Sequence, residues 1–455
     1  MEKQQNKFSN WLKTSVTARM LMVGFLVIVL LIPLSYINTL ITERSNRQES
    51  VVNEINEKWG NEVLFYGPIL KIPYKTYSEK IITSTNIREN RTEKIEHINY
   101  AYFFPKKLDM YANITPQEKK RGIYKTSVYK GEFKINGTYE KPDFTTINVN
   151  ETDIMWNKAT IIIKTSNLKG INNQVSINFD QQIFSFLPQY EVENKLNLND
   201  ITLNKLETAF LDKKVLPTDK LDSNFSINFN ISGSKQIRII PIGKETNLNI
   251  VSNWNTTNFI GDFLPLNSDK ITKSGFDAKW KVLHINRPFS QEYFEILPNL
   301  NKFAFGVNFM IPIDEYQKSE RSVKYGFLVI ALTFLIFFLI QSISKINIHP
   351  FQYFMIGLAL TVFYTLLISI SEHTNFLTAY IISGISVIVL ITLYSKSILK
   401  TYKFPLLIGL SLTALYTFIF IIIQLENYAL LVGSLGLFVI LSIVMYASRK
   451  IDWEY

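Results

Sequence analysis

The chain has 455 residues, a formal net charge of +10 and 47% apolar residues. It contains no cysteine, which excludes disulfides, thiolate metal sites and thiol catalysis. Its four histidines lack the spacing of a metal motif, and no basic run is long enough to indicate nucleic-acid binding. We therefore expect no metal, no cofactor and no nucleic-acid partner.

Residues 1–19 are polar and basic, and they precede an apolar stretch at 20–41. This arrangement is typical of a signal peptide or of an uncleaved first membrane helix. We favour the uncleaved helix, because no small-x-small cleavage site follows and the stretch reaches the ~20 residues that cross a bilayer. In residues 43–59 apolar side chains recur at every fourth position, which predicts that the helix continues beyond the membrane and stops near Gly60.

Residues 42–324 form a large polar region in which many segments alternate apolar and polar residues, as in Phe225, Ile227, Phe229 and Ile231. Period-two patterns of this kind predict a large antiparallel domain of the β-sandwich type, or two fused sandwiches. We interpret 232–234, Ser-Gly-Ser, as a hairpin turn. Residues 201–210 look helical and would interrupt the strands.

The last third of the chain holds five long apolar runs with short connections, at 325–343, 351–370, 376–394, 404–423 and 428–447. Each is close to the ~20 residues that a membrane helix needs. Only helices or closed barrels satisfy every backbone group in lipid, and unbroken apolar runs exclude a barrel. We therefore predict a five-helix transmembrane bundle over 325–447, followed by a short tail at 448–455.

The short loops predict the orientation of these helices. Lysine and arginine lie in alternate loops and at the C-terminal end, whereas the turns at 372–375 and 426–427 carry glutamate. Because basic loops stay in the cytoplasm, both termini are expected there and residues 42–324 on the outer side of the membrane. The expected surroundings are a lipid bilayer.

Glu372 and His373 form a polar pair at the outer end of the third of the six spans. One interpretation is an ion or proton site, because histidine titrates near neutral pH and a buried carboxylate shifts it. The other is a solvated turn at the lipid–water boundary. No Asp, Glu, Lys, Arg or His lies inside any predicted span, which argues against an ion-coupled transporter.

A second candidate is a cluster of aromatic residues and glycine in the large polar region, formed by Trp254, Phe259, Gly261, Asp262, Phe263, Pro265 and Trp280. Aromatic side chains supply much of the binding energy of interfaces, so the cluster is consistent with a ligand groove or a partner-binding face. The alternative is the core of the β-domain, with a tight turn at Gly261-Asp262.

Several short segments resemble the CreD family of inner-membrane proteins, and the similarity covers nearly the whole chain. They are Gly67-Pro68, 121–124, 252–254 with 259–265, 274–276, 321–333, His349-Pro350, 371–374 and 451–453. The resemblance implies a bacterial protein that is linked to envelope-stress regulation and affects envelope integrity. The resemblance implies no particular reaction, cofactor or ligand for this chain.

We therefore predict an α+β membrane protein with one N-terminal and five C-terminal spans around a periplasmic β-domain. Its expected role is non-enzymatic: the β-domain binds an envelope component or a protein partner in the periplasm or inner membrane. Three alternatives stay open, namely a small-molecule or lipid permease that uses the bundle, a periplasmic enzyme acting on glycan or lipid through paired carboxylates, and signalling with a membrane kinase.

Overall fold

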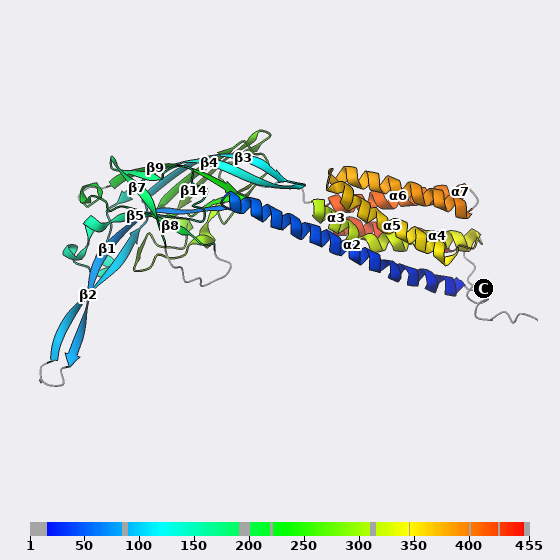
Figure 1. The fold of residues 1–455 in the computed structure, drawn as a ribbon, viewed down its shortest axis with the longest axis horizontal. Coiled ribbons are helices and arrows are strands. Elements are labelled where there is room, and N and C mark those ends of the chain that lie inside the picture. Colours follow the sequence, from blue (N-terminus) through cyan, green and yellow to red (C-terminus); the bar gives the residue numbers. More distant parts are fainter. Residues whose placement is uncertain are drawn as a thin grey trace, which may run out of the picture. The chain divides into compact units, whose positions relative to one another are not determined.

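A computed structural model describes residues 16–83, 90–190, 201–218, 222–309, 315–344, 346–399, 402–425 and 428–449 (Figure 1). The chain divides into two compact units. The β unit comprises residues 50–312, and the helix unit comprises the residues up to 49 and from 313 onward. Helix α2 (Val16–Lys58) contributes to both, which confirms the helix predicted to continue past the first apolar stretch.

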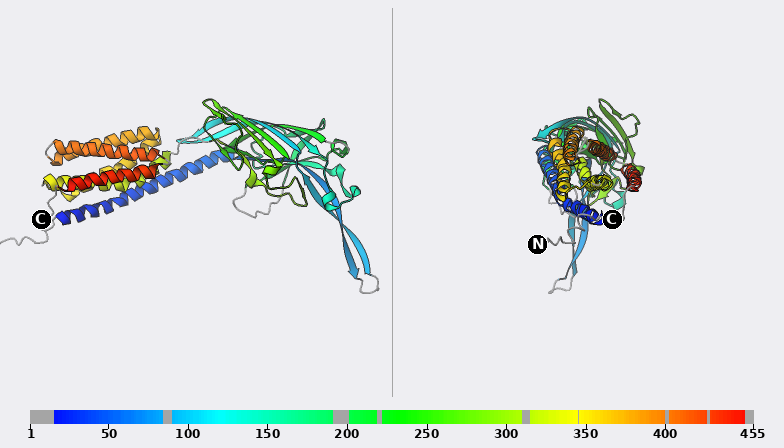
Figure 2. Two further views of the ribbon diagram at one scale, coloured as in Figure 1. Left: turned by 180° about the vertical axis from the view of Figure 1, so that it is seen from behind. Right: turned by 90° about the vertical axis from the view of Figure 1, so that its right-hand side faces the viewer.

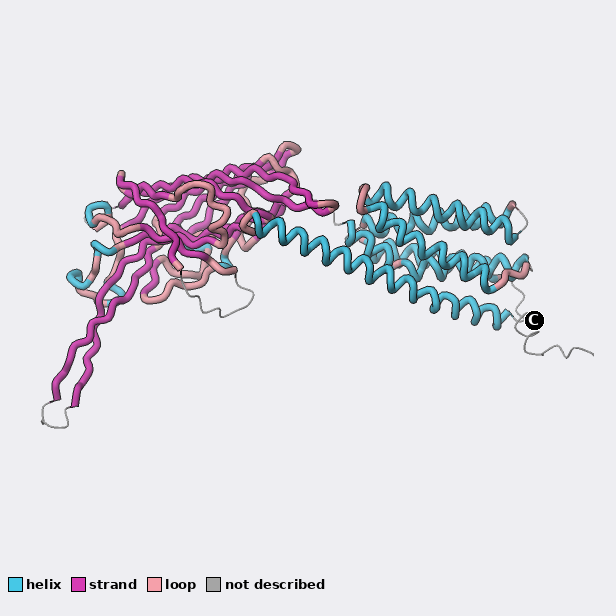
Figure 3. The backbone as a smooth tube through the Cα atoms, in the orientation of Figure 1, coloured by secondary structure: helices cyan, strands magenta, loops and turns pink. Residues whose placement is uncertain are grey.

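Six helices of the described chain are long and apolar enough to cross a membrane: α2, α4 (Gly326–Ser344), α5 (Pro350–Ser371), α6 (Phe376–Leu399), α7 (Lys403–Gln424) and α8 (Ala429–Ser448). One precedes the sheet region and five follow it, as the sequence predicts. The structure adds a short polar helix, α3 (Glu315–Lys324), which the sequence analysis did not predict. Figure 3 distinguishes these helices from the strands by colour.

Glycines let α2 pack closely against its neighbours in the helix unit. A Cβ atom at Gly357 of α5 would lie 2.0 Å from Cδ1 of Leu30, and one at Gly326 of α4 would lie 2.8 Å from Leu34. The buried residues of α2 recur at spacings of three and four, at Val23, Val27, Leu30 and Leu34. This spacing places one apolar stripe of α2 against the other helices.

The strands of the β unit are hydrogen-bonded in one continuous 16-stranded sheet, which consists of two parts that share one strand and are called the first and second sheet below. The first sheet contains β1 (Val63–Thr83), β2 (Asn90–Phe103), β5 (Thr160–Thr165), β8 (Asn204–Thr208), β10 (Gln236–Ile239), β12 (Thr257–Ile260), β15 (Glu292–Phe294) and β16 (Phe305–Phe309). The second contains β3 (Lys107–Arg121), β4 (Tyr124–Glu140), β6 (Ser176–Phe179), β9 (Asp222–Ser234), β11 (Glu245–Ser252), β13 (Ile271–Thr272) and β14 (Gly275–Leu283). Strand β7 (Gln182–Gln189) pairs with β6 through its first half and with β8 through its second half.

The apolar core lies between the two sheets, so the predicted sandwich is confirmed. The rings of Phe65 in β1 and Phe229 in β9 stack with centroids 5.6 Å apart. Tyr129 of β4 meets Phe309 of β16 at 5.1 Å. Alternating strands bury one side chain in two, and aromatic pairs across the sheets fill the space between them.

The sheets are mixed, because two of their strand pairs are parallel: β1 with β10, and β3 with β11. The predicted hairpin turn at 232–234 is wrong. Ser232 and Ser234 remain in β9 and pair with β4. The chain turns only at Lys235, whose φ of 60° is left-handed, and β10 then joins the other sheet beside β1. A hairpin turn would have kept both strands in one sheet.

The helical interruption predicted at 201–210 is also wrong, because this segment contains strand β8, which pairs with β5 and β7. Leu203 and Leu206 are three residues apart, which mimics a helix. In the sheet, however, Leu206 and Thr208 point to the same buried side at strand spacing. Pairing with two neighbouring strands outweighs local helix propensity here.

Strands β1 and β2 also form a long hairpin that projects from the rest of the β unit (Figure 2). Their pairing runs from Leu70 and Phe103 outward to Thr83 and Asn90. Tyr77 lies on this hairpin with 42% of its surface exposed.

Candidate functional site

The outer face of the second sheet carries a groove of about 430 Å³. It lies across β4, β3, β11 and β14, whose inward side chains fill the core. Residues in register on neighbouring strands lie side by side on one face. The register therefore places two rows in the groove: Asn136, Asp109, Asn247 and Lys281 in one, and Lys134, Tyr111, Asn249 and Lys279 in the other.

A loop after β12 raises one wall of this groove. The backbone N–H of Leu266 donates to the carbonyl of Lys279 at 2.7 Å. The side chain of Asn267 accepts from the Lys279 N–H and donates to the carbonyl of Asp277. These bonds run along the edge of β14, so the loop continues the sheet as a strand would. Leu266 lines the groove and is 69% exposed.

The amide side chains of the groove are held in defined positions. The Nδ2 atom of Asn247 donates to Asp109 at 2.8 Å and to Glu245 at 3.1 Å. Oδ1 of Asn249 is buried and has no hydrogen-bond partner in the described chain. A planar amide whose donors are occupied presents its oxygen in a fixed direction.

The charges of the groove are mainly positive. Lys281 pairs with Glu245 at 3.0 Å, and Lys279 pairs with Asp277 at 3.7 Å. Hydrogen bonds from Asn247 and Lys281 lower the pKa of Glu245, which therefore stays ionised. Lys134 has no ion-pair partner among the residues that the structure describes. The groove thus combines a free cation, amides and one aromatic ring.

The structure gives Glu372 and His373 different surroundings. Glu372 lies at the end of α5, and its side chain is 15% exposed. Its Oε1 accepts a hydrogen bond from the Tyr316 hydroxyl of α3 at 3.1 Å and lies 3.7 Å from Nε of Arg44 in α2. His373 is exposed beyond the helix end. The carboxylate therefore links three helices of the helix unit, and the imidazole does not join it.

The aromatic residues of the second candidate cluster pack onto the edge of the sandwich core. Phe259 meets the Trp280 ring at 5.7 Å, and Phe263 meets Phe305 at 5.4 Å. The indole N–H of Trp280 donates to the carbonyl of Phe263 at 3.0 Å. Trp280 is among the residues that line the groove, but its ring is buried and packs against Phe259 and Phe305.

The remaining members of that cluster shape the chain around these rings. Gly261 has a φ of 93°, and a Cβ atom there would lie 2.4 Å from the carbonyl oxygen of Ala304. Pro265 is buried, Asp262 is exposed and Trp254 is half-buried against the core. The cluster thus joins the loop after β12 to the core, and this loop forms the wall of the groove.

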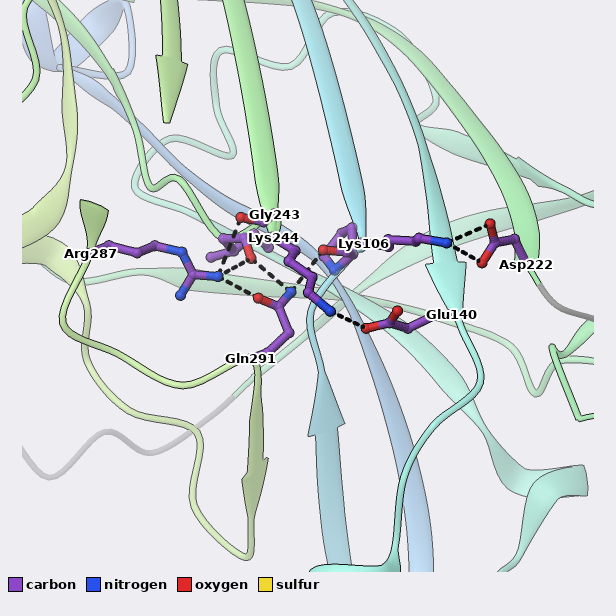
Figure 4. A network of polar contacts seen from close by, with 9 residues as sticks. Lys106, Glu140, Asp222, Gly243, Lys244, Arg287 and Gln291 are labelled. Atoms are coloured by element: carbon purple, nitrogen blue, oxygen red, sulfur yellow. Dashed lines mark hydrogen bonds and ion pairs between the residues drawn. The ribbon is translucent and has the colours of Figure 1, made fainter. Parts of the chain in front are cut away.

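A buried arginine fixes the start of the groove strands (Figure 4). Nη2 of Arg287 donates to the carbonyls of Ile242 and Gly243, and Nη1 donates to that of Phe289. Gln291 accepts from the same guanidinium and donates to Pro105, just before β3. Burial lowers the pKa of Arg287 to about 10, so the side chain stays charged at neutral pH.

A second polar hollow, of about 530 Å³, is lined by Asp143 and Glu151 among other residues. Asp143 accepts the backbone N–H of Thr145 at 2.8 Å, and Glu151 accepts the indole N–H of Trp156 at 3.0 Å. The hydrogen bond to Thr145 lowers the pKa of Asp143. A glycosidase needs a carboxylic acid that stays protonated near neutral pH, so Asp143 does not suit that role.

Within the described ranges, no three His, Asp or Glu side chains come together as ligands for a metal ion.

One known protein family matches the chain over residues of both the β unit and the helix unit. The family model described as "Inner membrane protein CreD" matches residues 15–454. The chain belongs to the CreD family. It is similar to "Inner membrane protein CreD" of Escherichia coli (strain K12), with 27% identity over 435 residues, which cover 94% of this chain and 91% of that relative. The resemblance noted in the sequence is thereby confirmed.

As a CreD protein with six apolar helices, the chain is a multi-pass protein of the inner membrane. The CreD match includes the groove strands and the segment that carries Glu372. The name of the relative describes its location and states no reaction or ligand.

Sequence reasoning missed the groove of this CreD protein. The polar groove residues are the outward-facing residues of strands in which polar and apolar residues alternate. The alternation was used only to identify the apolar residues that face the core. Alternation marks Tyr111 and Asn249 as outward-facing. Their position in one row depends on the pairing of β3 with β11, two strands more than a hundred residues apart in the chain, so no local signal could have joined them.

Proposed function

We propose that this CreD protein supports cell-envelope integrity and the response to envelope stress by binding an envelope component through its β unit. In this proposal residues 42–324 face the periplasm, 1–19 and 448–455 face the cytoplasm, and the helix unit is the membrane anchor. The pattern of basic and acidic short loops supports this orientation. The protein acts as a binding protein and not as an enzyme.

One observation carries the proposal: the core of the β unit is filled, whereas its outer face is hollowed by a groove in which amides and lysines lie among apolar surface. Aromatic pairs such as Phe65–Phe229 fill the space between the sheets. The groove across β3, β4, β11 and β14 has a volume within the ~300–1,000 Å³ typical of ligand sites. Its amides and lysines provide directional polar contacts, which bind a ligand without requiring a reaction.

The test is growth under envelope stress. A bacterial strain that lacks its own CreD relative is challenged with detergent and is given the full chain or a variant. Tyr111→Ala/Asn249→Ala alters the groove, and Tyr77→Ala is the control on the projecting hairpin. We expect the control to restore growth and the groove variant to fail at equal membrane abundance. Full rescue by the groove variant would contradict the proposal.

A second candidate function, a lipid-handling permease, is favoured by one feature of the helix unit. A hollow of about 560 Å³ lies between α4, α7 and α8. Its lining is almost entirely apolar and includes Leu332, Phe418 and Val439. A hollow of this chemistry, within helices that span the membrane, accommodates an acyl chain.

The same growth assay separates the two candidates. Val439→Trp fills the hollow with a larger apolar ring and leaves the β unit unchanged. The binding proposal expects this variant to restore growth. Failure of Val439→Trp at normal abundance, together with rescue by the groove variant, would favour the permease.

A further inference from the structure

The chemistry of the groove indicates the class of its ligand. Resting on the proposed function, we propose that the groove across β3, β4, β11 and β14 binds a negatively charged polysaccharide chain. Three features of the groove support this assignment: an exposed aromatic ring, a set of amides and a lysine without an ion-pair partner among the described residues.

Tyr111 gives the groove an aromatic surface. It is 40% exposed and lies in register between Asn249 on β11 and Lys134 on β4. Sugar rings carry C–H groups on one face, and these groups pack against the electron-rich face of an aromatic ring. An exposed tyrosine in the middle of a polar sheet face therefore suits a sugar ring better than it suits a simple anion.

The amides match the hydroxyl groups of a sugar. Asn136, Asn247 and Asn249 all line the groove, and an amide offers both a donor and an acceptor, as a hydroxyl does. The buried Oδ1 of Asn249 has no partner in the described chain. Buried polar atoms are normally paired, and the Asn249 side chain has to turn this enclosed oxygen toward the groove before a ligand hydroxyl can donate to it.

The charges indicate an acidic sugar. The lining includes Lys134, Lys279 and Lys281, but only one carboxylate, that of Asp109. That carboxylate is already occupied, because it pairs with Lys107 at 2.8 Å and accepts from Asn247. Lys279 and Lys281 are paired with Asp277 and Glu245, so Lys134 is the lysine of the lining that is left to pair with an acidic group of a glycan.

The polar face continues beyond the groove, which suits a chain more than a single sugar. In register with Asn136 lies Ser226 of β9, and with Lys134 lies Asn228. Strand β6 extends both rows with Asn178 and Ser176. Polar and charged side chains, interrupted only by Tyr111, thus follow the two rows across six strands of the sheet.

The experiment is a titration of the full-length protein, purified in detergent, with tetragalacturonate as the probe. Tetraglutamate carries comparable charge without sugar rings and serves as the control ligand. We expect tetragalacturonate to bind and tetraglutamate to bind at least tenfold more weakly. Tyr111→Ala should weaken the binding of tetragalacturonate by about fivefold or more, as expected for an aromatic side chain that contributes over ~1 kcal/mol to binding.

Matched variants outside the groove provide the controls. Tyr77→Ala removes a tyrosine of similar exposure outside the groove and should leave binding unchanged. Lys134→Gln should weaken binding, whereas Lys130→Gln should not, because Lys130 is exposed on the same face of β4 but does not line the groove. Equal binding of both ligands, or no effect of Tyr111→Ala, would overturn the inference.

The titration tests the sugar assignment and the growth assay tests the proposed function, so each proposal can be rejected without the other. If the groove variant fails to rescue growth and tetragalacturonate does not bind, the groove remains a binding site and the sugar assignment is rejected. If the sugar binds through Tyr111 but the groove variant rescues growth fully, the site is a glycan site and the proposed role in envelope integrity is rejected.

Discussion

The hydroxyl of Tyr316 lies 3.1 Å from Oε1 of Glu372, and this hydrogen bond joins α3 to the end of α5. Tyr316 itself is buried, and the carboxylate is 15% exposed. The same oxygen lies 3.7 Å from Arg44 of α2. One carboxylate thus connects a short helix that the sequence did not reveal to two of the apolar helices.

Tyr316 should contribute more than Arg44 to the stability of the helix unit. A hydrogen bond to a charged group contributes roughly 1.5–3 kcal/mol, so Tyr316→Phe should lower the free energy of unfolding by about 2 kcal/mol. Arg44 is 47% exposed, and exposed ion pairs contribute about 0–1 kcal/mol. Thermal unfolding in detergent, followed by circular dichroism, measures both variants. A larger loss for Arg44→Gln than for Tyr316→Phe would contradict this account.

Ionised Glu207 should stabilise the β unit, and this stabilisation should be lost in acid. Burial raises its pKa, but hydrogen bonds from Thr160 and Lys205 and the charge of Lys71 outweigh burial and lower it from the usual 4.5. Since the folded-state pKa is the lower one, this stabilisation is fully present above pH 4.5 and is lost as the pH falls through the folded-state pKa.

Glu207→Gln tests this pH dependence. The variant should lose about 2 kcal/mol of unfolding free energy at pH 7, in line with hydrogen bonds to charged groups. Its unfolding free energy should also change less than that of the wild type between pH 5 and pH 3. Urea unfolding at a series of pH values is the measurement, and parallel pH profiles for the two proteins would refute the assignment.

Gly261 should be far less tolerant of alanine than Gly122, although both have positive φ. The left-handed conformation alone costs a side chain about 1–2 kcal/mol. Gly122, with a φ of 62°, has open space around the missing Cβ, so Gly122→Ala should cost only that amount. At Gly261 the Cβ would also meet the Ala304 carbonyl at 2.4 Å, and overpacking adds about 1–3 kcal/mol. Chemical unfolding measures the free energy of unfolding of both variants. Similar losses of unfolding free energy would show that the backbone at Ala304 shifts at little cost and would contradict this prediction.

Arg287→Leu should destabilise the β unit by about 4 kcal/mol, because it leaves several buried carbonyls without a donor. Arg287→Lys should lose less, since the ammonium keeps the charge but cannot reproduce the planar fork of donors. Guanidinium unfolding measures both free energies. If Arg287→Leu were as stable as the wild type, the carbonyls would have to find other donors, and the network in Figure 4 would not fix the strands.

The membrane helices were predictable because their signal is local. A run such as 351–370 is apolar at every depth of the bilayer, and its composition alone requires a helix. Strand alternation was equally readable at Phe225 and Ile227 in β9. Strand partners were not, since the chain after Ser234 could turn back or cross to the other sheet, and Lys235 sends it across. The helix-like spacing of Leu203 and Leu206 misled for the same reason, because pairing in the sheet decided their structure.

The sequence by itself determined the six apolar helices, the β-sandwich that lies between the first and second of them in the chain, and the family. It could do so because hydrophobic periodicity and short sequence motifs depend on residues that are close together in the chain. Only the tertiary structure decided which polar residues share a site. It placed Glu372 with Tyr316 and Arg44 and left His373 outside, and it brought Tyr111 beside Asn249. These contacts depend on strand register and helix packing, which arise when distant segments bury their apolar faces together.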